Sequence, residues 1–403
     1  KEETAWYESI LIKNAQDKTI HRVLNVDMKS AVPEGSNYAS IIQRATLDVI
    51  LRSGRKSKTS LIIKKSHEVK EKAKIIDDFS LFKGEISMYS KVLTKYEQLM
   101  NNYDDNRDKL WSTLIGYQPY NLLVFEDLKR ENYKVADRTA MLDKSHAKLV
   151  LNSLGRFHAM GYVLIQKGLI SKDDLSPYYL EIDSPIVNNF VGGALQQLCN
   201  VICNKWPSEW KELGDRLSKQ VDVVLEKLKS FFPTSEDSFV TVCHGDCWTC
   251  NMMFKYCPYD ENIPIAVKFF DFQCPHINSY AFDVIYFLYV SVLPEVRRTF
   301  WNELISEYQK SLASTLSLYG IEGKAPTLEH IEAEMQRLEY YAMVVNLIYL
   351  AITSTEEQTA FTMEKLNVGC NGVDAINPKV FNNEKYINTV KFDLRKWFNK
   401  EVF

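Results

Sequence analysis

The sequence predicts an α+β protein, with a small region of mixed strands and helices followed by a large, mainly helical region. Strand-like patterns of apolar residues occur mostly before residue 129. After that point, apolar residues at helical spacing dominate. One short β segment, at 238–272, interrupts the helical part. This order of patterns predicts a bilobal chain that divides into 1–128 and 129–403.

Length and charge limit the class of protein. The 403 residues correspond to two or three domains, or to one bilobal protein, at ~100–200 residues per domain. The net charge of −3 gives no indication of a nucleic-acid partner or an anionic membrane surface. No run of ~18 apolar residues occurs, so we expect no membrane-spanning helix. We therefore expect neither nucleic acid nor a membrane as a partner, and the sequence leaves the oligomeric state open.

The cysteines indicate a reducing compartment. Eight cysteines in 403 residues are too few for a disulfide scaffold. The sequence also contains no Asn-X-Ser/Thr acceptor for glycosylation. We therefore expect a cytoplasmic protein.

The first region is predicted to contain a hairpin, a helix and a further strand. Residues 39–51 alternate in part between apolar and polar side chains, and 59–65 form a second apolar run. Between them, the glycine and the charges of 52–58 suit a hairpin turn. Residues 68–100 are charged and periodic, which predicts a helix. The apolar run within 119–128 predicts a strand that leads into the second region.

The second region is predicted to be helical apart from one β segment. Residues 143–168 have apolar side chains at helical spacing, and 209–232 read as one long amphipathic helix. Residues 341–352 predict a buried helix, and from about Asp283 onward we expect helix throughout.

The β segment is predicted to be a strand followed by a hairpin. Residues 238–246 form the strand, which ends in the motif His-Gly-Asp. Residues 251–256 and 264–272 form the two arms of the hairpin, with 257–263 as the loop between them.

Oxygen-bearing side chains gather around this hairpin. Asp246 follows the buried strand, Asn251 comes five residues later, and Asp271 lies near the end of the second hairpin arm. A hairpin brings its two ends together, so we expect Asn251 and Asp271 to be neighbours. Carboxylate and amide oxygens of this kind suit a hard cation such as Mg²⁺.

The same residues follow the order of a phosphotransfer site. The spacing from Asp246 to Asn251 matches that of the kinase catalytic loop, and Asp271 begins "DFQ" where kinases have DFG. Lys64 ends a predicted strand, and Glu85 lies in the helix that follows it, as expected for a pair that holds nucleotide phosphates. Spacing alone leaves Lys65 as an alternative to Lys64, because neighbours on a strand point to opposite faces.

Each of these residues also has a purely structural interpretation. Asp246 is compatible with a loop cap, Asp271 with a turn residue and Glu85 with a solvated helix charge. Asp283 is compatible with a helix N-cap. His158, on an otherwise apolar face, is interpreted as structural.

The stretch "CHGDCWTCN" (243–251) also raises the hypothesis of a zinc site. Cys247 and Cys250 form one C-x₂-C pair. The remaining ligands would have to come from elsewhere, for instance Cys257, Cys274 or His276. The alternative is that Cys243 faces the core and that Cys247 and Cys250 fill small loop positions. A phosphotransfer loop explains more residues with fewer assumptions.

Several strings together resemble one protein family. They are "GSNYAS" (35–40), "SLIIK" (60–64), "FKGEISMY" (82–89), "VFEDL" (124–128), "RFHAMG" (156–161), "HGDCWTCN" (244–251), "VKFFDFQ" (267–273) and "YAFDVIYFL" (280–288). With them, the chain resembles the ecdysteroid kinase-like family of insects, within the aminoglycoside phosphotransferase and choline kinase group. The resemblance implies a protein-kinase-like bilobal fold that phosphorylates alcohol groups of small molecules with ATP and Mg²⁺.

The resemblance also implies a role for each matching residue. Asp246 would be the catalytic base, Asn251 and Asp271 the Mg²⁺ ligands, Lys64 the phosphate-binding lysine and Glu85 its ion-pair partner. The remaining positions would bind the nucleotide or support the catalytic loop. These are Ser36, Asn37 and Tyr38 in the phosphate loop, the backbone of Glu126, Asp127 and Leu128 at adenine, and His244 and Asp283 as structural support.

The sequence departs from the family at Cys247 and Cys250, where Leu and Asn are frequent. Neither change removes a catalytic group. We expect an ecdysteroid or a similar lipophilic alcohol or xenobiotic as the hydroxylated substrate. A choline- or aminoglycoside-type kinase is the alternative within the same class. A catalytically silent binding protein is the alternative from another class, but Lys64, Asp246, Asn251 and Asp271 are all present.

Overall fold

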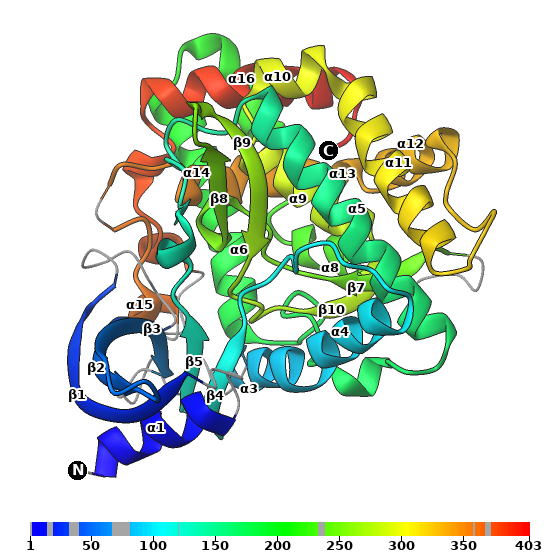
Figure 1. The fold of residues 1–403 in the computed structure, drawn as a ribbon. Coiled ribbons are helices and arrows are strands. Elements are labelled where there is room, and N and C mark those ends of the chain that lie inside the picture. Colours follow the sequence, from blue (N-terminus) through cyan, green and yellow to red (C-terminus); the bar gives the residue numbers. More distant parts are fainter. Residues whose placement is uncertain are drawn as a thin grey trace.

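The computed structural model describes residues 2–13, 19–31, 40–66, 81–119, 121–232, 238–357, 359–366 and 372–403. The predicted phosphate-loop residues Ser36, Asn37 and Tyr38 lie outside these ranges, as does the first part of the helix predicted at 68–100. The fold combines a sheet-rich region with a larger helical region, as Figure 1 shows.

The sheet-rich region is built on five antiparallel strands in the order β1-β2-β3-β5-β4. Helix α1 (Glu2–Lys13) packs against this sheet and buries Tyr7, Ile10 and Leu11 on it. The strands are β1 (Ile20–Ser30), β2 (Ser40–Leu51), β3 (Lys56–Ser66), β4 (Leu114–Gln118) and β5 (Leu122–Glu126). The strands predicted within 39–51, 59–65 and 119–128 are therefore confirmed, and so is the hairpin turn between the first two.

Strands β1 and β4 and helix α1 were not expected from the sequence. β1 lies at the edge of the sheet beside β2, and most of its residues are exposed or half-buried, so its apolar residues do not alternate regularly. β4 spans five residues and contains Gly116. Short or one-sided strands carry a weak periodic signal, which explains why both were missed.

A helical segment begins at Leu81, after the β2–β3 hairpin. It consists of α3 (Leu81–Ser87), the π-helical turn η1 (Met88–Val92) and α4 (Leu93–Asn102). Glu85 lies in α3 with 1% of its surface exposed, so its carboxylate is held inside the protein.

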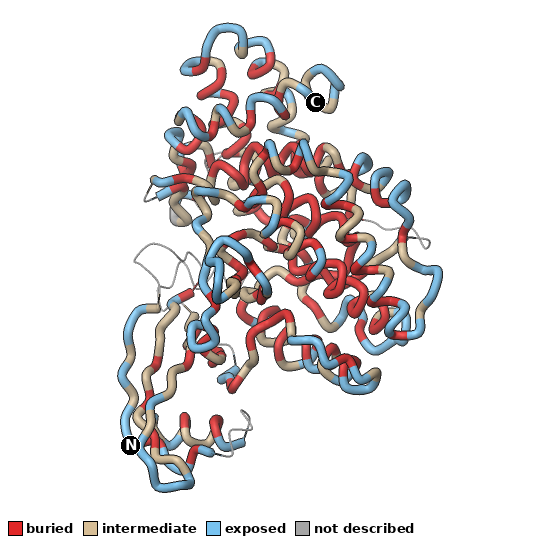
Figure 2. The backbone as a smooth tube through the Cα atoms, turned by 45° about the horizontal axis from the view of Figure 1, so that its top comes forward, coloured by how far each residue is buried: buried red, intermediate tan, exposed pale blue. Residues whose placement is uncertain are grey.

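The helical region has its core between long helices that pack along one another, chiefly α5 (Lys144–Gln166) and α11 (Trp301–Leu318). Figure 2 shows buried residues concentrated in the middle of this region. The other α-helices are α6 (Pro185–Lys205), α7 (Lys211–Ser218), α8 (Val224–Lys229), α9 (Ala281–Val290), α10 (Pro294–Thr299), α12 (Leu328–Arg337), α13 (Glu339–Val344), α14 (Leu350–Thr353), α15 (Met363–Leu366) and α16 (Glu384–Asn399). The π-helical turn is η6 (Val345–Tyr349), and the 3₁₀ turns are η2 (Leu128–Glu131), η3 (Lys172–Asp174), η4 (Ser208–Trp210), η5 (Thr249–Asn251), η7 (Val373–Ala375) and η8 (Pro378–Val380).

The single long helix predicted over 209–232 is wrong. The structure has two short helices, α7 and α8, joined by turns at 219–223. Leu217 before the turns and Val224 after them are both buried, so each helix packs its own apolar side on the core. Tertiary packing outweighs the continuous amphipathic pattern here. In contrast, the buried helix predicted at 341–352 is confirmed as the run α13, η6 and α14.

The β segment inside the helical region forms two small sheets. β7 (Val240–Cys243) pairs with β10 (His276–Ser279), which the sequence did not indicate. β8 (Met252–Cys257) and β9 (Asp260–Phe269) form the predicted hairpin, with β6 (Tyr133–Lys134) beside β8. The loop is shorter than the predicted 257–263, because Cys257 already pairs with Asp260.

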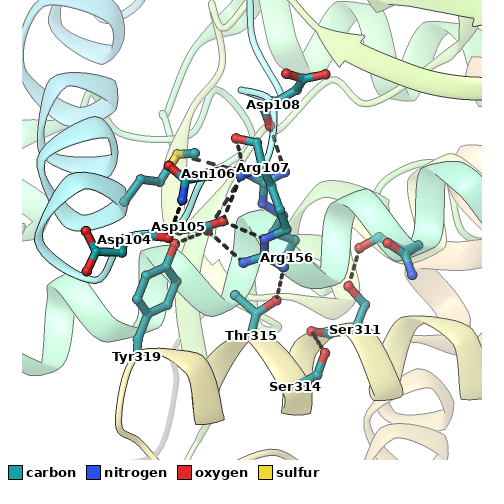
Figure 3. A network of polar contacts seen from close by, with 12 residues as sticks. Asp104, Asp105, Asn106, Arg107, Asp108, Arg156, Ser311, Ser314, Thr315 and Tyr319 are labelled. Carbon is teal, nitrogen blue, oxygen red and sulfur yellow. Dashed lines mark hydrogen bonds and ion pairs between the residues drawn. The ribbon is translucent and has the colours of Figure 1, made fainter.

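A buried ionic network, the Asp105 network, joins the segment after α4 to helices α5 and α11 (Figure 3). Arg107 donates two 2.7 Å hydrogen bonds to the Asp105 carboxylate, and the Tyr319 hydroxyl donates another at 2.6 Å. Arg156 of α5 lies 3.9 Å from the same carboxylate and donates to the carbonyl oxygen of Asp108. The network therefore fixes the end of the Glu85-bearing segment against the helical region.

Among the helices in the described part of the chain, none combines the length and the apolar composition needed to cross a membrane.

Candidate functional site

Lys64 lies at the centre of the candidate site. It projects from β3 between its neighbours β2 and β5, opposite Ile42 and Leu123, and is 5% exposed. Its ammonium contacts two carboxylates, Glu85 at 2.5 Å and Asp271. The adjacent Lys65 is more exposed, so the structure brings Lys64, and not Lys65, to the carboxylates.

The charges around Lys64 do not balance. Burial by itself would lower the pKa of Lys64, but the negative charges of Asp271 and Glu85 outweigh it and raise that pKa. Burial raises the pKa of Glu85, with Lys64 opposing and Asp271 adding to the rise. The second carboxylate oxygen of Glu85, Oε1, is buried without a hydrogen-bond partner. One ammonium therefore faces more negative charge than it can neutralise.

The hairpin brings Asn251 next to the segment that carries Asp271, as predicted. Met252 pairs with Phe269, and the carbonyl oxygen of Asn251 accepts a 3.0 Å hydrogen bond from the N–H of Phe270. Asp271 has a φ of 62°, a left-handed conformation that a non-glycine residue adopts at some cost. This backbone turn ends the strand and lets the Asp271 carboxylate meet Lys64.

Asp246 is held by two side-chain donors. The amide of Asn251 donates to Oδ2 at 2.8 Å, and the hydroxyl of Tyr286 donates to Oδ1 at 3.0 Å. Burial and the charge of Asp271 raise the pKa of Asp246 to about 7, against the effect of these hydrogen bonds. Asp246 and Asp271 thus come from two ends of the β segment and act on one another electrostatically.

The loop before Asp246 is shaped by Asp283. This buried carboxylate of α9 accepts hydrogen bonds from the backbone N–H groups of His244 at 2.6 Å and Gly245 at 2.9 Å. His158 contacts it at 3.1 Å. Burial would raise the pKa of Asp283, but His158 and the backbone donors hold it below its ordinary value. Asp283 is therefore a charged anchor for the loop.

The loop structure explains why a histidine occupies position 244 and a glycine position 245. His244 Nδ1 accepts from the N–H of Asp246, and Nε2 lies 3.0 Å from the carbonyl oxygen of Phe270, so a neutral ring protonated at Nε2 satisfies both contacts. Burial lowers the pKa of His244, which also favours the neutral ring. Gly245 has a φ of 81°, and a Cβ there would lie 1.9 Å from the carbonyl oxygen of Cys274.

The connection between the two regions is tied to both. Glu126 accepts from the N–H of Thr113 at 2.8 Å and from Lys268 at 3.2 Å. Asp127 accepts from Arg44 and from Ser60, each at 2.7 Å. Leu128, which begins the turn η2, is buried. These contacts fix the backbone at the position predicted to face adenine.

The cysteines of "CHGDCWTCN" do not converge on one point. Cys243 faces the carbonyl oxygens of Asn278 and Ser279, Cys247 is fully buried in the core, and Cys250 is half-buried. Within the described ranges, no group of three or more His, Cys, Asp or Glu side chains is arranged to hold a metal ion. The described structure therefore lends no support to the zinc hypothesis.

Two residues of the site were not assigned a role from the sequence. Tyr286, which the sequence did not single out, contacts Asp246. His158 was interpreted as structural, and it contacts Asp283 and, at 2.9 Å, the hydroxyl of Tyr308. The spacing of Tyr286, three residues after Asp283, puts both on one face of α9 and is the signal that could have found it.

A strand lysine paired with a helix glutamate, beside an Asp–Asn–Asp set on a hairpin, is the arrangement of a kinase-like protein. A model of the ecdysteroid kinase-like family matches residues 34–321 of this chain. The match covers more than half of the 403 residues, and the chain belongs to the ecdysteroid kinase-like family. Membership makes it a small-molecule kinase-like protein. Among curated proteins, none matches the sequence.

Proposed function

We propose that this protein transfers the γ-phosphoryl group of ATP, with Mg²⁺, to a hydroxyl of a small lipophilic alcohol such as an ecdysteroid. The observation that carries the proposal is the Lys64 ammonium, which contacts Glu85 and Asp271 while Asp246 and Asn251 lie beside them. Three segments that are far apart in the sequence meet there. Family membership supports the same reaction class.

The donor set fits a bound magnesium ion. Lys64 offsets only part of the charge of Glu85, Asp271 and Asp246, so a divalent cation would remove the remaining repulsion. The amide nitrogen of Asn251 is engaged by Asp246, which leaves its amide oxygen for the cation. Asn251 and Asp271 would hold Mg²⁺, which would neutralise charge on the nucleotide phosphates.

Catalysis would then depend mainly on how the protein positions ATP and the acceptor. Lys64, held by Glu85, would bind the phosphates, and the backbone at 126–128 would face adenine. The oxygen of the acceptor hydroxyl would bond to the γ-phosphorus as ADP leaves. Asp246 would accept the proton of that hydroxyl. Asp283 would keep Asp246 in place through the backbone of His244 and Gly245.

The proposal includes a bilobal arrangement, in which 1–128 would bind ATP and 129–403 would carry the catalytic loop and the acceptor. The proposal also assigns a phosphate-binding loop to Ser36, Asn37 and Tyr38, on the basis of the family resemblance. We also propose the cytosol as the location, which fits the use of ATP and the unpaired state of seven cysteines in the described residues.

The test is the variant Asp246→Asn, which keeps the shape of the side chain and removes its charge, together with Asp246→Ala. Phosphorylation of the acceptor should fall by about 10³-fold or more, because the proton acceptor is lost, while ATP binding stays nearly intact. Product is measured by mass detection of the added phosphate, and ATP binding by calorimetry.

Asp222→Ala is the matched control, since Asp222 is an exposed carboxylate in the turn between α7 and α8. It should leave turnover unchanged. Full turnover by either Asp246 variant would contradict the proposal.

A further inference from the structure

A group of aromatic side chains lies beside Asp246 on the side of the helical region. We define the aromatic cluster as Tyr179, Phe190, Tyr286, Tyr349 and Phe361. Its members come from a loop, from α6, from α9, from η6 and from the segment after α14. The Tyr286 ring is 5.7 Å from that of Tyr349, and Phe190 is 5.8 Å from Tyr349 and 5.4 Å from Phe361, measured between ring centroids.

The cluster is joined to the candidate site by one hydrogen bond. The Tyr286 hydroxyl donates to Asp246 Oδ1 at 3.0 Å, so the first ring of the cluster touches the proposed proton acceptor. A molecule that presents a hydroxyl to Asp246 would therefore rest near these rings.

The exposure of the rings argues against a purely structural role. Tyr286 and Tyr349 are buried, with 4% and 8% of their surface exposed, as expected for rings that build a core. Tyr179, Phe190 and Phe361 are only half-buried, although they pack against the same group. Half-buried aromatic rings next to a functional carboxylate are typical of a ligand-binding surface.

The Tyr179 and Tyr349 hydroxyls form a pair, with their oxygens 2.6 Å apart. Each hydroxyl carries one proton, and a single hydrogen bond between them uses only one of the two. The other proton is left to donate to an oxygen outside the pair. Burial raises the pKa of both tyrosines above its ordinary value, so both hydroxyls stay neutral.

The charge around the cluster favours a neutral ligand. Among the described residues, Asp246 is the one charged side chain that forms a hydrogen bond with the cluster, and the proposed reaction already uses it. Within the same ranges, no Lys or Arg stacks on the rings of Tyr179, Phe190, Tyr286 or Tyr349. A quaternary ammonium would find aromatic rings here but, in the described part of the chain, no second carboxylate hydrogen-bonded to Tyr179, Tyr286 or Tyr349.

We propose that the aromatic cluster is the acceptor-binding surface and that the Tyr179–Tyr349 hydroxyl pair is its specificity-determining element. The pair hydrogen-bonds an oxygen of a neutral, flat alcohol whose ring system lies against Tyr179, Phe190 and Phe361. The inference rests on the proposed function, because it takes Asp246 as the group that receives the acceptor proton.

The experiment measures binding and turnover separately, with 20-hydroxyecdysone as the neutral probe and choline as the cationic one. In calorimetry, Tyr349→Phe and Tyr179→Phe should each weaken binding of the steroid by about fivefold, the loss of one hydrogen bond. In turnover, the same variants should raise KM for the steroid and leave kcat and KM for ATP unchanged. A general loss of structure would not raise KM for the steroid while leaving kcat and KM for ATP unchanged.

The matched control is Tyr256→Phe, which removes a hydroxyl that contacts His146 at 3.1 Å on β8, outside the cluster. It should change neither steroid binding nor turnover. Thermal unfolding of all three variants checks that the fold is kept.

Three outcomes would overturn the inference: no steroid binding by the wild-type protein, tighter binding of choline than of the steroid, or unchanged steroid affinity in both cluster variants. A protein that binds the steroid through the cluster but transfers no phosphoryl group would overturn the proposed function and leave the acceptor surface standing. Failure of the two proposals is thus distinguishable.

Discussion

The Asp105 network and the candidate site are both clusters of buried charge, but they treat their carboxylates in opposite ways. In the network, one carboxylate meets Arg107, Arg156 and the Tyr319 hydroxyl. Although burial acts against it, these donors hold the pKa of Asp105 well below its usual range. The charged group that is destabilised is the guanidinium of Arg156, because burial and the charge of Arg107 lower its pKa to about 10.

In the candidate site, one ammonium serves Glu85 and Asp271 while Asp246 lies close by. The pKa of Asp246 is raised to about 7, and Glu85 Oε1 has no partner. In the Asp105 network the carboxylate is fully paired, and the group without a partner is a donor, the buried Nε of Arg156. The site instead has negative charge that a bound cation would satisfy. The difference teaches that an ion cluster built for stability and one built for chemistry can be told apart by which groups are left unsatisfied.

Between the two clusters, the largest expected contrast is in the activity of Asp271→Asn. Removing this carboxylate takes away a proposed Mg²⁺ ligand, and phosphoryl transfer should fall by about 10²–10³-fold. The free energy of unfolding should change little, because Lys64 keeps its contact with Glu85. Turnover is measured by ADP release and stability by urea denaturation.

Asp260→Asn is its control, since Asp260 is exposed at the far end of the same strand, β9. It should alter neither quantity. A large loss of stability with preserved turnover in Asp271→Asn would reverse the comparison between the two clusters.

The next effect is on stability. Asp105→Ala leaves Arg156 buried without its carboxylate and should lower the free energy of unfolding by about 3 kcal/mol, as for a broken buried ion pair. Activity per folded molecule should stay within about twofold, because the network lies outside the site. The measurement is urea denaturation alongside turnover. Asp108→Ala, an exposed carboxylate nearby, serves as the control and should be close to neutral.

The smallest effect is a pH dependence of stability at His276. Burial lowers the pKa of His276 from 6.5 to about 4 in the folded protein. The stability that the neutral ring contributes is therefore present above pH 6.5 and is lost as the pH falls toward 4. Between pH 7 and pH 5, the free energy of unfolding of the wild-type protein should fall by about 2 kcal/mol more than that of His276→Gln.

Urea denaturation at several pH values measures this difference directly. The Asp105 network gives the contrast, since a carboxylate whose pKa is held low keeps its contribution throughout this window. Equal slopes for the wild-type and His276→Gln proteins would contradict the prediction.

Much of the sheet and the hairpin could be predicted from the sequence. The segments at 40–51, 56–66 and 252–269 carry strong local patterns and turn residues, and the structure has strands there. The two helices within 209–232 could not be predicted, because the break between α7 and α8 depends on what each helix packs against. β10 could not be predicted either, since its partner β7 is more than thirty residues away.

The sequence by itself determined which chemical groups the site contains. Asp246, Asn251 and Asp271 stand at fixed spacings within one β segment, and local hairpin geometry is enough to bring the last two together. The tertiary structure alone decided the electrostatics: that Lys64 meets Asp271 from 207 positions away, and that Tyr286 reaches Asp246. Burial and charge act through space, so the raised pKa of Asp246 and the aromatic surface beside it exist only once distant segments have packed.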